Sequence, residues 1–235
     1  MLSTLVICTA WKTVKYNFDP RIHNFGNVGF GGRMHAMLAP IAERVIDVVA
    51  YDGEDVRTAL HGRLDAGTVV DLGCGTGSST PPGACGVDSS NAMISVARSR
   101  FKDKRFVVAD AETFGEEDAY DTALVSYVLH EAPETGRRAI LANAMRIARR
   151  SVYVMDISSS YIPSPLMLTG EPYVLDYLEK IDSEIAEIAL SPKASGLITE
   201  GLGRQRVTLY HIVLHPHHTT RRPLPRRSGF EQTWG

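Results

Sequence analysis

The fold of this chain is decided by the stretch Val69-Val70-Asp71-Leu72-Gly73-Cys74-Gly75-Thr76-Gly77. An apolar strand pattern ends in an acid and continues into three glycines at alternate positions. Glycine permits a tight turn and a close approach of the backbone to a ligand. A dinucleotide-binding G-x-G-x-x-G loop would need a further glycine at Ser78 or Thr80, and no Gly-Lys-Ser/Thr of a phosphate loop follows. The pattern therefore disfavours both of those nucleotide sites.

Strand and helix patterns alternate on both sides of this stretch. Such alternation predicts an α/β fold, a doubly wound and mostly parallel sheet with helices on both faces. Ligands of such sheets bind at the carboxyl ends of the strands. The predicted strands are residues 68–72, 85–87, 105–109, 122–127, 151–155 and 206–214. The predicted helices are residues 35–50, 54–64, 91–101 (capped by Ser89 or Ser90), 134–149 and 171–190.

The D-x-G-x-G-x-G arrangement resembles motif I of the class I S-adenosylmethionine-dependent methyltransferases, of the type 11/25 kind that acts on small molecules. Residues 86–93, 106–111 and 121–133 are similar to the segments that follow the next three strands of that family. Together the four motifs cover roughly residues 66 to 157. The resemblance implies a Rossmann-like fold, and the alternative is a glycine-rich turn in an unrelated α/β protein.

The resemblance also implies which residues bind the cofactor, S-adenosyl-L-methionine. Asp88 would bind the ribose hydroxyls, because a carboxylate accepts two hydrogen bonds. Asp110 and the next backbone N–H would address the adenine. The full cofactor-binding set is Asp71, Gly73, Cys74, Gly75, Gly77, Asp88, Ser89, Asp110, Ala111 and Tyr127.

His130 and Glu131 are the candidate catalytic residues, because they follow the fourth strand of the predicted sheet. The imidazole has the unperturbed pKa of a general base, and Glu131 would orient it. The alternative is that His130 caps or packs the following turn. Asp156, at the end of the fifth strand, would contact substrate or serve as a turn residue.

Three segments surround this core. Residues 1–34 are predicted to form an N-terminal arm, in which Lys15, Tyr16, His23 and Asn24 would close over the cofactor. Residues 35–214 would form the methyltransferase domain, with a substrate lid inserted at about 158–190. Residues 215–235 are basic and are expected to be a disordered tail.

Two departures from the family pattern stand out. Gly77 and Asp88 are too close for a full crossover helix, and Pro81 and Pro82 would stop one as it starts. We therefore expect a shortened first crossover helix. The strand 206–214 reads as the first of two closing strands, but prolines follow it. We therefore expect the last strand to be missing.

Composition narrows the functional classes. The 235 residues are 44% hydrophobic and 22% charged, with a formal net charge of −2, as in a soluble globular domain. Six arginines from position 204 onward leave the rest of the chain acidic, which favours a small-molecule substrate over nucleic acid. Three cysteines and no membrane-length apolar run predict a cytoplasmic protein without an integral membrane segment. An organelle-targeting N-terminus is the alternative, and the oligomeric state is open.

The predicted function is methyl transfer from S-adenosylmethionine to a small organic acceptor. A methyltransferase-like binding or scaffold protein of weak or no activity is the alternative that the short crossover favours. Methylation of a protein or RNA is a third reading, which the basic tail would serve. We predict no metal site, because no Cys or acid with ligand spacing accompanies the histidines near the C-terminus.

Overall fold

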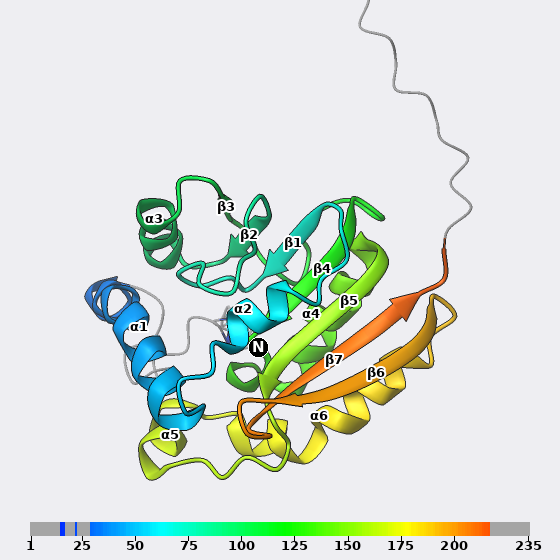
Figure 1. The fold of residues 1–235 in the computed structure, drawn as a ribbon. Coiled ribbons are helices and arrows are strands. Elements are labelled where there is room, and N and C mark those ends of the chain that lie inside the picture. Colours follow the sequence, from blue (N-terminus) through cyan, green and yellow to red (C-terminus); the bar gives the residue numbers. More distant parts are fainter. Residues whose placement is uncertain (1–14, 17–21, 23–28, 217–235) are drawn as a thin grey trace, which may run out of the picture.

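The computed structural model describes residues 15, 16, 22 and 29–216 (Figure 1). The strands are β1 (Val69–Leu72), β2 (Cys85–Asp88), β3 (Arg105–Val108), β4 (Tyr120–Ser126), β5 (Ala148–Ile157), β6 (Ala194–Leu202) and β7 (Val207–Leu214). The helices are α1 (Gly29–Ala50), α2 (Val56–His61), α3 (Asn91–Arg100), α4 (Glu134–Ile147), α5 (Pro165–Gly170) and α6 (Val174–Ala189), with a short 3-10 helix, η3 (Leu129–Glu131).

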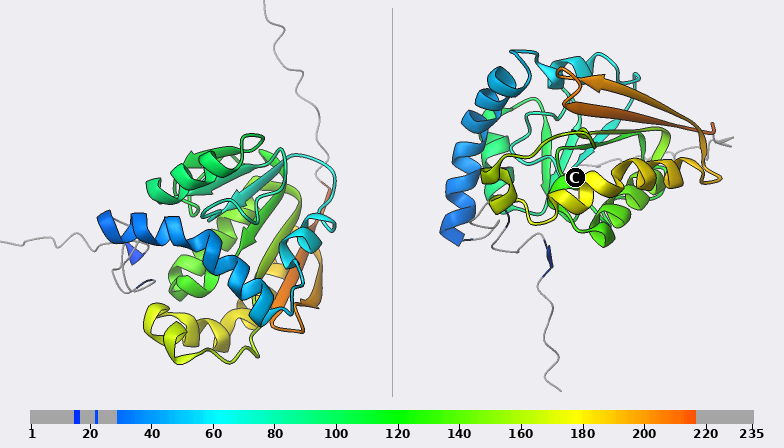
Figure 2. Two further views of the ribbon diagram at one scale, coloured as in Figure 1. Left: turned by 60° about the vertical axis from the view of Figure 1, so that its left-hand side comes forward. Right: turned by 90° about the horizontal axis from the view of Figure 1, so that it is seen from below.

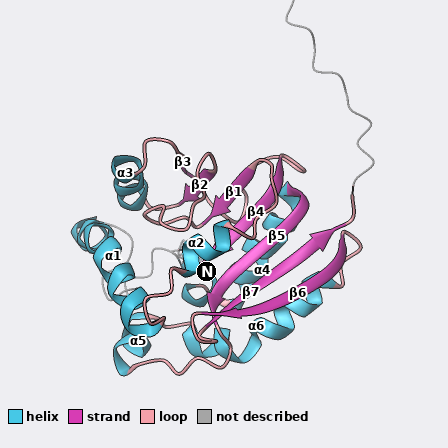
Figure 3. Ribbon diagram, viewed as in Figure 1, coloured by secondary structure: helices cyan, strands magenta, loops and turns pink. Residues whose placement is uncertain are grey.

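The seven described strands form one mixed sheet in the order β3-β2-β1-β4-β5-β7-β6 (Figure 3). Strands β1 to β5 are parallel to one another. Strand β7 runs antiparallel to both of its neighbours, β5 and β6. The predicted fold class, a mostly parallel Rossmann-like sheet with helices, is confirmed. Because β1 to β5 are parallel, their carboxyl ends lie at one edge of the sheet.

One face of the sheet holds the larger part of the core. Val70 and Leu72 of β1 point into it together with Val87 of β2. Leu141 of α4 and Ile181 of α6 close this layer, and all five side chains are fully buried. The amphipathic pattern of these two helices thus serves to cover the central strands.

The opposite face is covered unevenly. Asp71, Gly86, Leu124 and Phe106 are register partners on this face. Helix α2 packs over Leu124, and α3 packs over Phe106. Between these two helices, Asp71 is covered by the loop of residues 73–84 instead of a helix.

The first crossover contains no helix, so the predicted shortening is confirmed and is complete. Short turns replace the helix: the Gly77 amide donates to the Cys74 carbonyl (2.9 Å), and the Ala84 amide to the Pro81 carbonyl (3.2 Å). Thr80 is fully buried and donates its hydroxyl to Asp71 Oδ2 (2.6 Å). The loop therefore fills, with its own side chains, the space that a helix would occupy.

Two helices hold this loop from outside. Glu43 of α1 accepts hydrogen bonds from the hydroxyls of Thr76 (3.1 Å) and Ser78. Arg100 of α3 donates to the same two hydroxyl oxygens, at 2.8 and 2.9 Å. In the left view of Figure 2, α1 runs across the front of the molecule, between α3 and the segment that contains α5.

The expectation of a missing last strand is wrong. Residues 207–214 are the last strand, β7, which pairs on both sides, and its partner β6 precedes it in the chain. Strand β6 is an edge strand, largely exposed, and contains Gly196 and Gly201. Glycine is depleted in strands, and an exposed edge lacks a buried apolar face, so the sequence pattern of β6 is weak. Of the prolines after residue 214, Pro216 lies in the described part of the chain and follows β7.

The remaining differences concern element boundaries. Helix α1 begins at Gly29, earlier than the predicted 35, and so takes the end of the predicted arm. The helix predicted over 171–190 is α6, and α5 precedes it as a separate helix. Most of the predicted arm and most of the predicted tail lie outside the described residues. Across the described ranges, every helix is too short or too polar to cross a membrane.

Candidate functional site

A cavity of about 720 Å³ lies at the carboxyl ends of the parallel strands. Its lining includes the residues after β1, β2 and β4, one face of α1, and the segment that contains α5. Among the lining residues are Gly73, Cys74, Gly75, Thr76, Asp88, Tyr127, His130, Glu131, Tyr161, Met167 and Glu171. The volume is in the range typical of ligand-binding cavities, and the cavity lies at the edge where the sequence predicts a ligand site.

The glycine loop wraps around the end of β1. The amides of Gly73 and Cys74 both donate to the Val87 carbonyl, at 2.8 and 2.9 Å. Gly73, Gly75 and Gly77 have φ values of 77°, 51° and 82°, a region that glycine enters without strain. These conformations keep the backbone of the loop against the edge of the cavity.

Two of the glycines also allow close packing. A Cβ atom at Gly73 would stand 2.7 Å from the Val128 side chain, and one at Gly77 would stand 2.6 Å from the Phe106 ring. Gly77 lines neither cavity of this site. It belongs to the fold of the loop, whereas Gly73, Cys74 and Gly75 border the cavity.

Asp88, at the end of β2, is held by backbone donors. Its Oδ2 accepts the Gly75 amide (2.9 Å), and its Oδ1 accepts the Ser90 amide (2.8 Å). Burial raises the pKa of Asp88 to about 6, while the two amides act in the opposite direction. Each carboxylate oxygen keeps a further lone pair for a hydroxyl donor from the cavity.

A second, smaller cavity of about 70 Å³ adjoins the first. Both are lined by Gly73, Asp88, Val128 and Glu131. The smaller cavity brings together the predicted residues Asp88, Ser89, Asp110 and Ala111, with Tyr16 and Ile22 from the N-terminal arm.

The arm reaches this smaller cavity through Lys15 and Tyr16. Lys15 pairs with Asp110 and with Glu112 (3.0 Å to the latter). A Cβ at Gly136 of α4 would stand 2.6 Å from the Tyr16 ring, so Tyr16 packs directly on that helix. His23 and Asn24, also predicted for this role, lie outside the described residues.

Asp71 has a different place from the one that the sequence predicts. Its carboxyl group points away from both cavities and is fully buried beneath Thr80. Burial raises the pKa of Asp71 to about 7, against the effects of the Thr80 hydroxyl and the Lys104 charge. Asp71 thus supports the loop from behind.

Tyr127 is a strained residue at the cavity wall. Its φ of 52° is unusual for a residue with a side chain, and such strain gathers at functional sites. The Tyr127 hydroxyl donates to the Tyr51 hydroxyl (3.2 Å), and the Arg57 guanidinium lies 5.0 Å from the centre of the Tyr127 ring. Arg57 in turn bonds Asp47 (2.6 Å) and also lines the cavity.

His130 is oriented by Asp156 and not by Glu131. The Asp156 Oδ1 atom lies 2.6 Å from His130 Nδ1, and its Oδ2 accepts the amides of Leu129 (3.0 Å) and His130 (3.3 Å). Asp156, at the end of β5, is buried and does not line the cavity. The sequence hypothesis that Glu131 holds the ring is therefore wrong, and so is direct contact of Asp156 with a ligand in this cavity.

The charge state of His130 follows from its neighbours. Burial alone lowers the pKa of an imidazole, but the Asp156 carboxylate, with further help from Glu131 and Glu171, raises the pKa of His130 to about 9. An imidazole in that state is a hydrogen-bond donor at neutral pH. The predicted role of a simple general base does not fit this environment.

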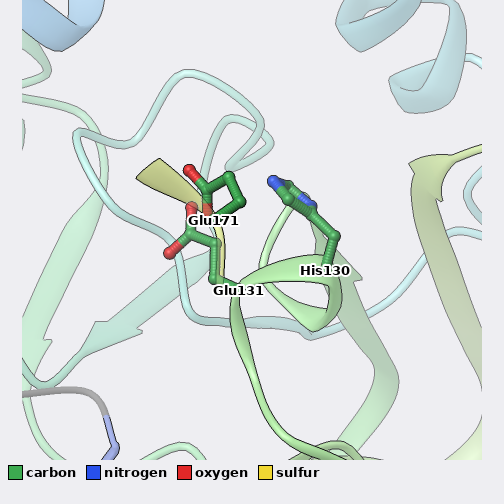
Figure 4. Close-up of side chains that lie close together, drawn as sticks. All are labelled: His130, Glu131 and Glu171. Atoms are coloured by element: carbon green, nitrogen blue, oxygen red, sulfur yellow. The ribbon is translucent and has the colours of Figure 1, made fainter. Parts of the chain in front are cut away.

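Part of the segment predicted as a substrate lid lines the cavity. Tyr161, Met167 and Glu171 line the cavity, whereas α6 packs into the core, where Tyr177 donates its hydroxyl to the Ile157 carbonyl (2.8 Å). Glu171 stands beside His130 and Glu131 (Figure 4). Within the predicted lid segment 158–190, the residues that line the cavity lie between 161 and 171.

Sequence reasoning missed three contributors: Arg57, Glu171 and the inner face of α1. Arg57 sits in a short helix without a motif, and Glu171 lies far along the chain from His130. The helical spacing of apolar residues in α1 signals an amphipathic face but does not tell which surface it lines.

Comparison with known proteins agrees with this geometry. Residues 69–151 match the model of a family described as a methyltransferase domain. The matched stretch, under half of the chain, is thus similar to a methyltransferase domain. A trans-aconitate 2-methyltransferase of Escherichia coli O1:K1 is 42% identical over 74 residues, which are 28% of this chain and 29% of that relative. The match therefore spans under a third of the curated relative.

Solved structures resemble the fold over more of the chain. A SAM-dependent methyltransferase from Thermotoga maritima covers 77% of this chain and 99% of its own length, with 16% identity and a TM-score of 0.56. One from Aquifex aeolicus covers 72% of this chain and 93% of its own length, with 14% identity and a TM-score of 0.52. At these identities the likeness concerns the fold alone.

Proposed function

We propose that the protein transfers a methyl group from S-adenosyl-L-methionine to a small organic acceptor. One observation carries this proposal: a single cavity is lined both by the glycine loop with Asp88 and by His130 with Glu131. On this proposal the glycine loop and Asp88 would bind the cofactor, and His130 and Glu131 would border the place of the acceptor. The methyltransferase domain match supports the same reaction class.

The residues present fit the cofactor. Asp88 keeps acceptor capacity toward the cavity, which suits the two ribose hydroxyls. Ser89, Asp110 and Ala111 border the adjoining smaller cavity, where the adenine would lie and Tyr16 would cover it. The missing crossover helix removes one N-terminal dipole from the site, so the backbone of Gly73, Cys74 and Gly75 carries more of the binding.

The chemistry is supplied by the bound cofactor, whose sulfonium methyl is attacked in line by an acceptor atom. The task of the chain is then to place the reactants and exclude water. His130, fixed by Asp156, and Glu131 border the cavity from η3. We infer that these two residues position the acceptor.

The acceptor is a small molecule on this proposal. The cavity wall combines apolar side chains of α1 and Met167 with aromatic Tyr127 and Tyr161. This lining suits an organic molecule with a few polar groups better than a nucleic acid.

The chain would work in the cytoplasm, in agreement with Cys74 and Cys85 as free buried thiols.

Calorimetry with S-adenosylmethionine tests the proposal. The wild-type protein should bind one equivalent, and Asp88→Asn should weaken binding about 10- to 100-fold, because hydrogen bonds to a charged acceptor contribute about 1.5–3 kcal/mol. Asp103→Asn, at an exposed position, is the matched control and should bind like wild type. No detectable binding by the wild-type protein would sink the proposal and leave the scaffold alternative. With binding shown, a panel of small acids, amines and alcohols with methyl-labelled cofactor identifies the acceptor.

A further inference from the structure

His130, Glu131 and Glu171 form a cluster of metal-ligating side chains at the wall of the large cavity. Each of the three offers one ligand atom, and these atoms all lie within 4.8 Å of one another. Figure 4 shows that the far ring nitrogen of His130 points toward the two carboxylates. Two residues come from η3 and the third from the turn after α5, so the fold brings the set together from distant positions.

The spacing of the ligand atoms suits a small divalent cation. With metal–ligand bonds of about 2.0–2.2 Å, neighbouring ligand atoms of one ion stand roughly 3–4 Å apart. Small rotations of the two glutamate side chains would bring the cluster to this spacing. A donor set of one imidazole and two carboxylates suits Mn²⁺, Fe²⁺ or Zn²⁺ better than a thiolate-seeking ion.

The surroundings of His130 are those of a metal-ligating histidine. Its Nδ1 is bound to the Asp156 carboxylate at 2.6 Å, which fixes the ring and directs Nε2 to the cavity, where a bound ion would displace the Nε2 proton. A carboxylate in this position is the usual outer partner of a histidine that binds a metal. Asp156 is itself fixed by the amides of Leu129 and Ile157.

The charge balance also favours a cation. Three carboxylates stand around one imidazole: Asp156 bonds the Nδ1 atom of His130, and Glu131 and Glu171 share the ligand cluster. Asp156 and Glu171 are buried, and Glu131 is half-buried. Buried charge is costly unless it is offset.

We propose that His130, Glu131 and Glu171 bind one divalent first-row metal ion, and that this ion holds an oxygen of the methyl acceptor. Three protein ligands and an adjoining cavity leave coordination positions for water or substrate, which is the pattern of a catalytic rather than a structural metal site. The second part rests on the proposed function, whereas the ion site stands without it. The sequence pattern missed the site because Glu171 has no ligand spacing with His130.

Titration with Mn²⁺ tests the ion site. Protein stripped with EDTA and dialysed is titrated by calorimetry, and bound Mn²⁺ is followed by electron paramagnetic resonance. Mn²⁺ is used as the probe instead of Zn²⁺ because the sequence also carries His215, His217 and His218, and imidazoles such as these bind Zn²⁺ more tightly than Mn²⁺. The expected result is one equivalent bound by the full chain.

Matched variants locate that ion. Glu171→Gln should weaken Mn²⁺ binding at least 10-fold, and Asp156→Asn should weaken it about 10- to 100-fold through the imidazole. Glu179→Gln, the same change at an exposed position of α6, should bind like wild type. If Glu171→Gln does not fold, as judged by circular dichroism, Glu131→Gln replaces it. Absence of wild-type binding at millimolar Mn²⁺, or equal affinity in wild type and the ligand variants, overturns the proposal.

The two proposals fail separately. S-adenosylmethionine binding in EDTA without any Mn²⁺ site would overturn the metal proposal and keep the proposed function. A Mn²⁺ site that depends on Glu171, in a protein that does not bind S-adenosylmethionine, would keep the ion site and overturn the methyl-transfer function.

Discussion

The buried carboxyl group of Asp71 should make the stability of this protein fall as pH rises through the neutral range. Asp71 is fully buried where a crossover helix would otherwise lie, and burial raises its pKa from 3.8 to about 7. The folded state therefore holds a proton that the unfolded chain has already lost. Between these two pKa values, each step to higher pH favours the unfolded chain.

The magnitude follows from the shift. The pKa values of 3.8 for the unfolded chain and about 7 for the folded protein differ by about 3 units, or about 4 kcal/mol over the full window, at 1.36 kcal/mol per unit. Between pH 5 and pH 8, the part of the window that is accessible without acid unfolding, the loss is about 2.5 kcal/mol. Above pH 8 the contribution becomes constant, because the group is then ionised in both states.

Urea unfolding of wild type and Asp71→Asn at several pH values measures this loss. The asparagine does not titrate, so the free energy of unfolding of wild type relative to the variant should fall by about 2.5 kcal/mol from pH 5 to pH 8. Taking the difference removes the effect of other titrating groups such as Asp88. The exposed Asp103→Asn should track wild type at every pH. If wild type and Asp71→Asn run parallel over this range, the reasoning is refuted.

Three further predictions concern packing and local hydrogen bonds. Gly77→Ala should lower the free energy of unfolding by about 2–5 kcal/mol, because a Cβ there would meet an aromatic ring of β3 at 2.6 Å and φ is +82°. Gly83→Ala is the control: φ is +74° but no atom lies within 4 Å of the added Cβ, so the loss should be only about 1–2 kcal/mol. Equal losses of the two variants in urea unfolding would contradict the steric argument. Arg137→Ala should lower the free energy of unfolding by about 3–5 kcal/mol, because it leaves Glu184, which is 2% exposed, without the guanidinium at 2.6 Å. The Glu184→Gln, Arg137→Ala double variant should recover part of the lost melting temperature. No recovery would contradict the cost of an unpaired buried charge. Ser90 caps α3, because its hydroxyl oxygen accepts a hydrogen bond from the Met93 amide at 3.3 Å. Ser90→Ala should lower the free energy of unfolding by about 1 kcal/mol, as measured with urea. An unchanged urea midpoint would show that water replaces the cap.

The central part of the fold was predictable because its strands are apolar, short and bounded by glycine or acids. The run around Val70 and Leu72 predicts a buried strand, and Pro81 and Pro82 correctly predict the lost crossover helix. Strand β6 was not predictable, because an exposed edge strand carries no alternating apolar pattern. The same limit applies to the position of β7 between β5 and β6, which depends on pairing with a strand that is distant in sequence.

The site was predictable where strand ends carry motif residues, as for Asp88, and less so where it depends on side-chain direction. Asp71 precedes the glycines in the motif, yet the pleat turns its carboxyl group beneath Thr80, where it does not line the cavity. Sequence reasoning chose the wrong partner for His130 because Glu131 is its neighbour in the chain. The actual partner, Asp156, lies near the end of β5, the strand that pairs with β4. Contacts between distant segments, such as Glu171 with His130, follow from the fold and not from spacing.

The attachment of α1 to the glycine loop has a thermodynamic consequence. Glu43 binds the hydroxyls of Thr76 and Ser78, so the docked helix and the ordered loop share the same hydrogen bonds. Two structures that share bonds are linked reciprocally: a ligand that favours the ordered loop also favours the docked helix, by the same free energy. Amide hydrogen exchange in α1, a helix with only two buried residues, Gly32 and Ala36, would therefore report on events at a loop many residues away.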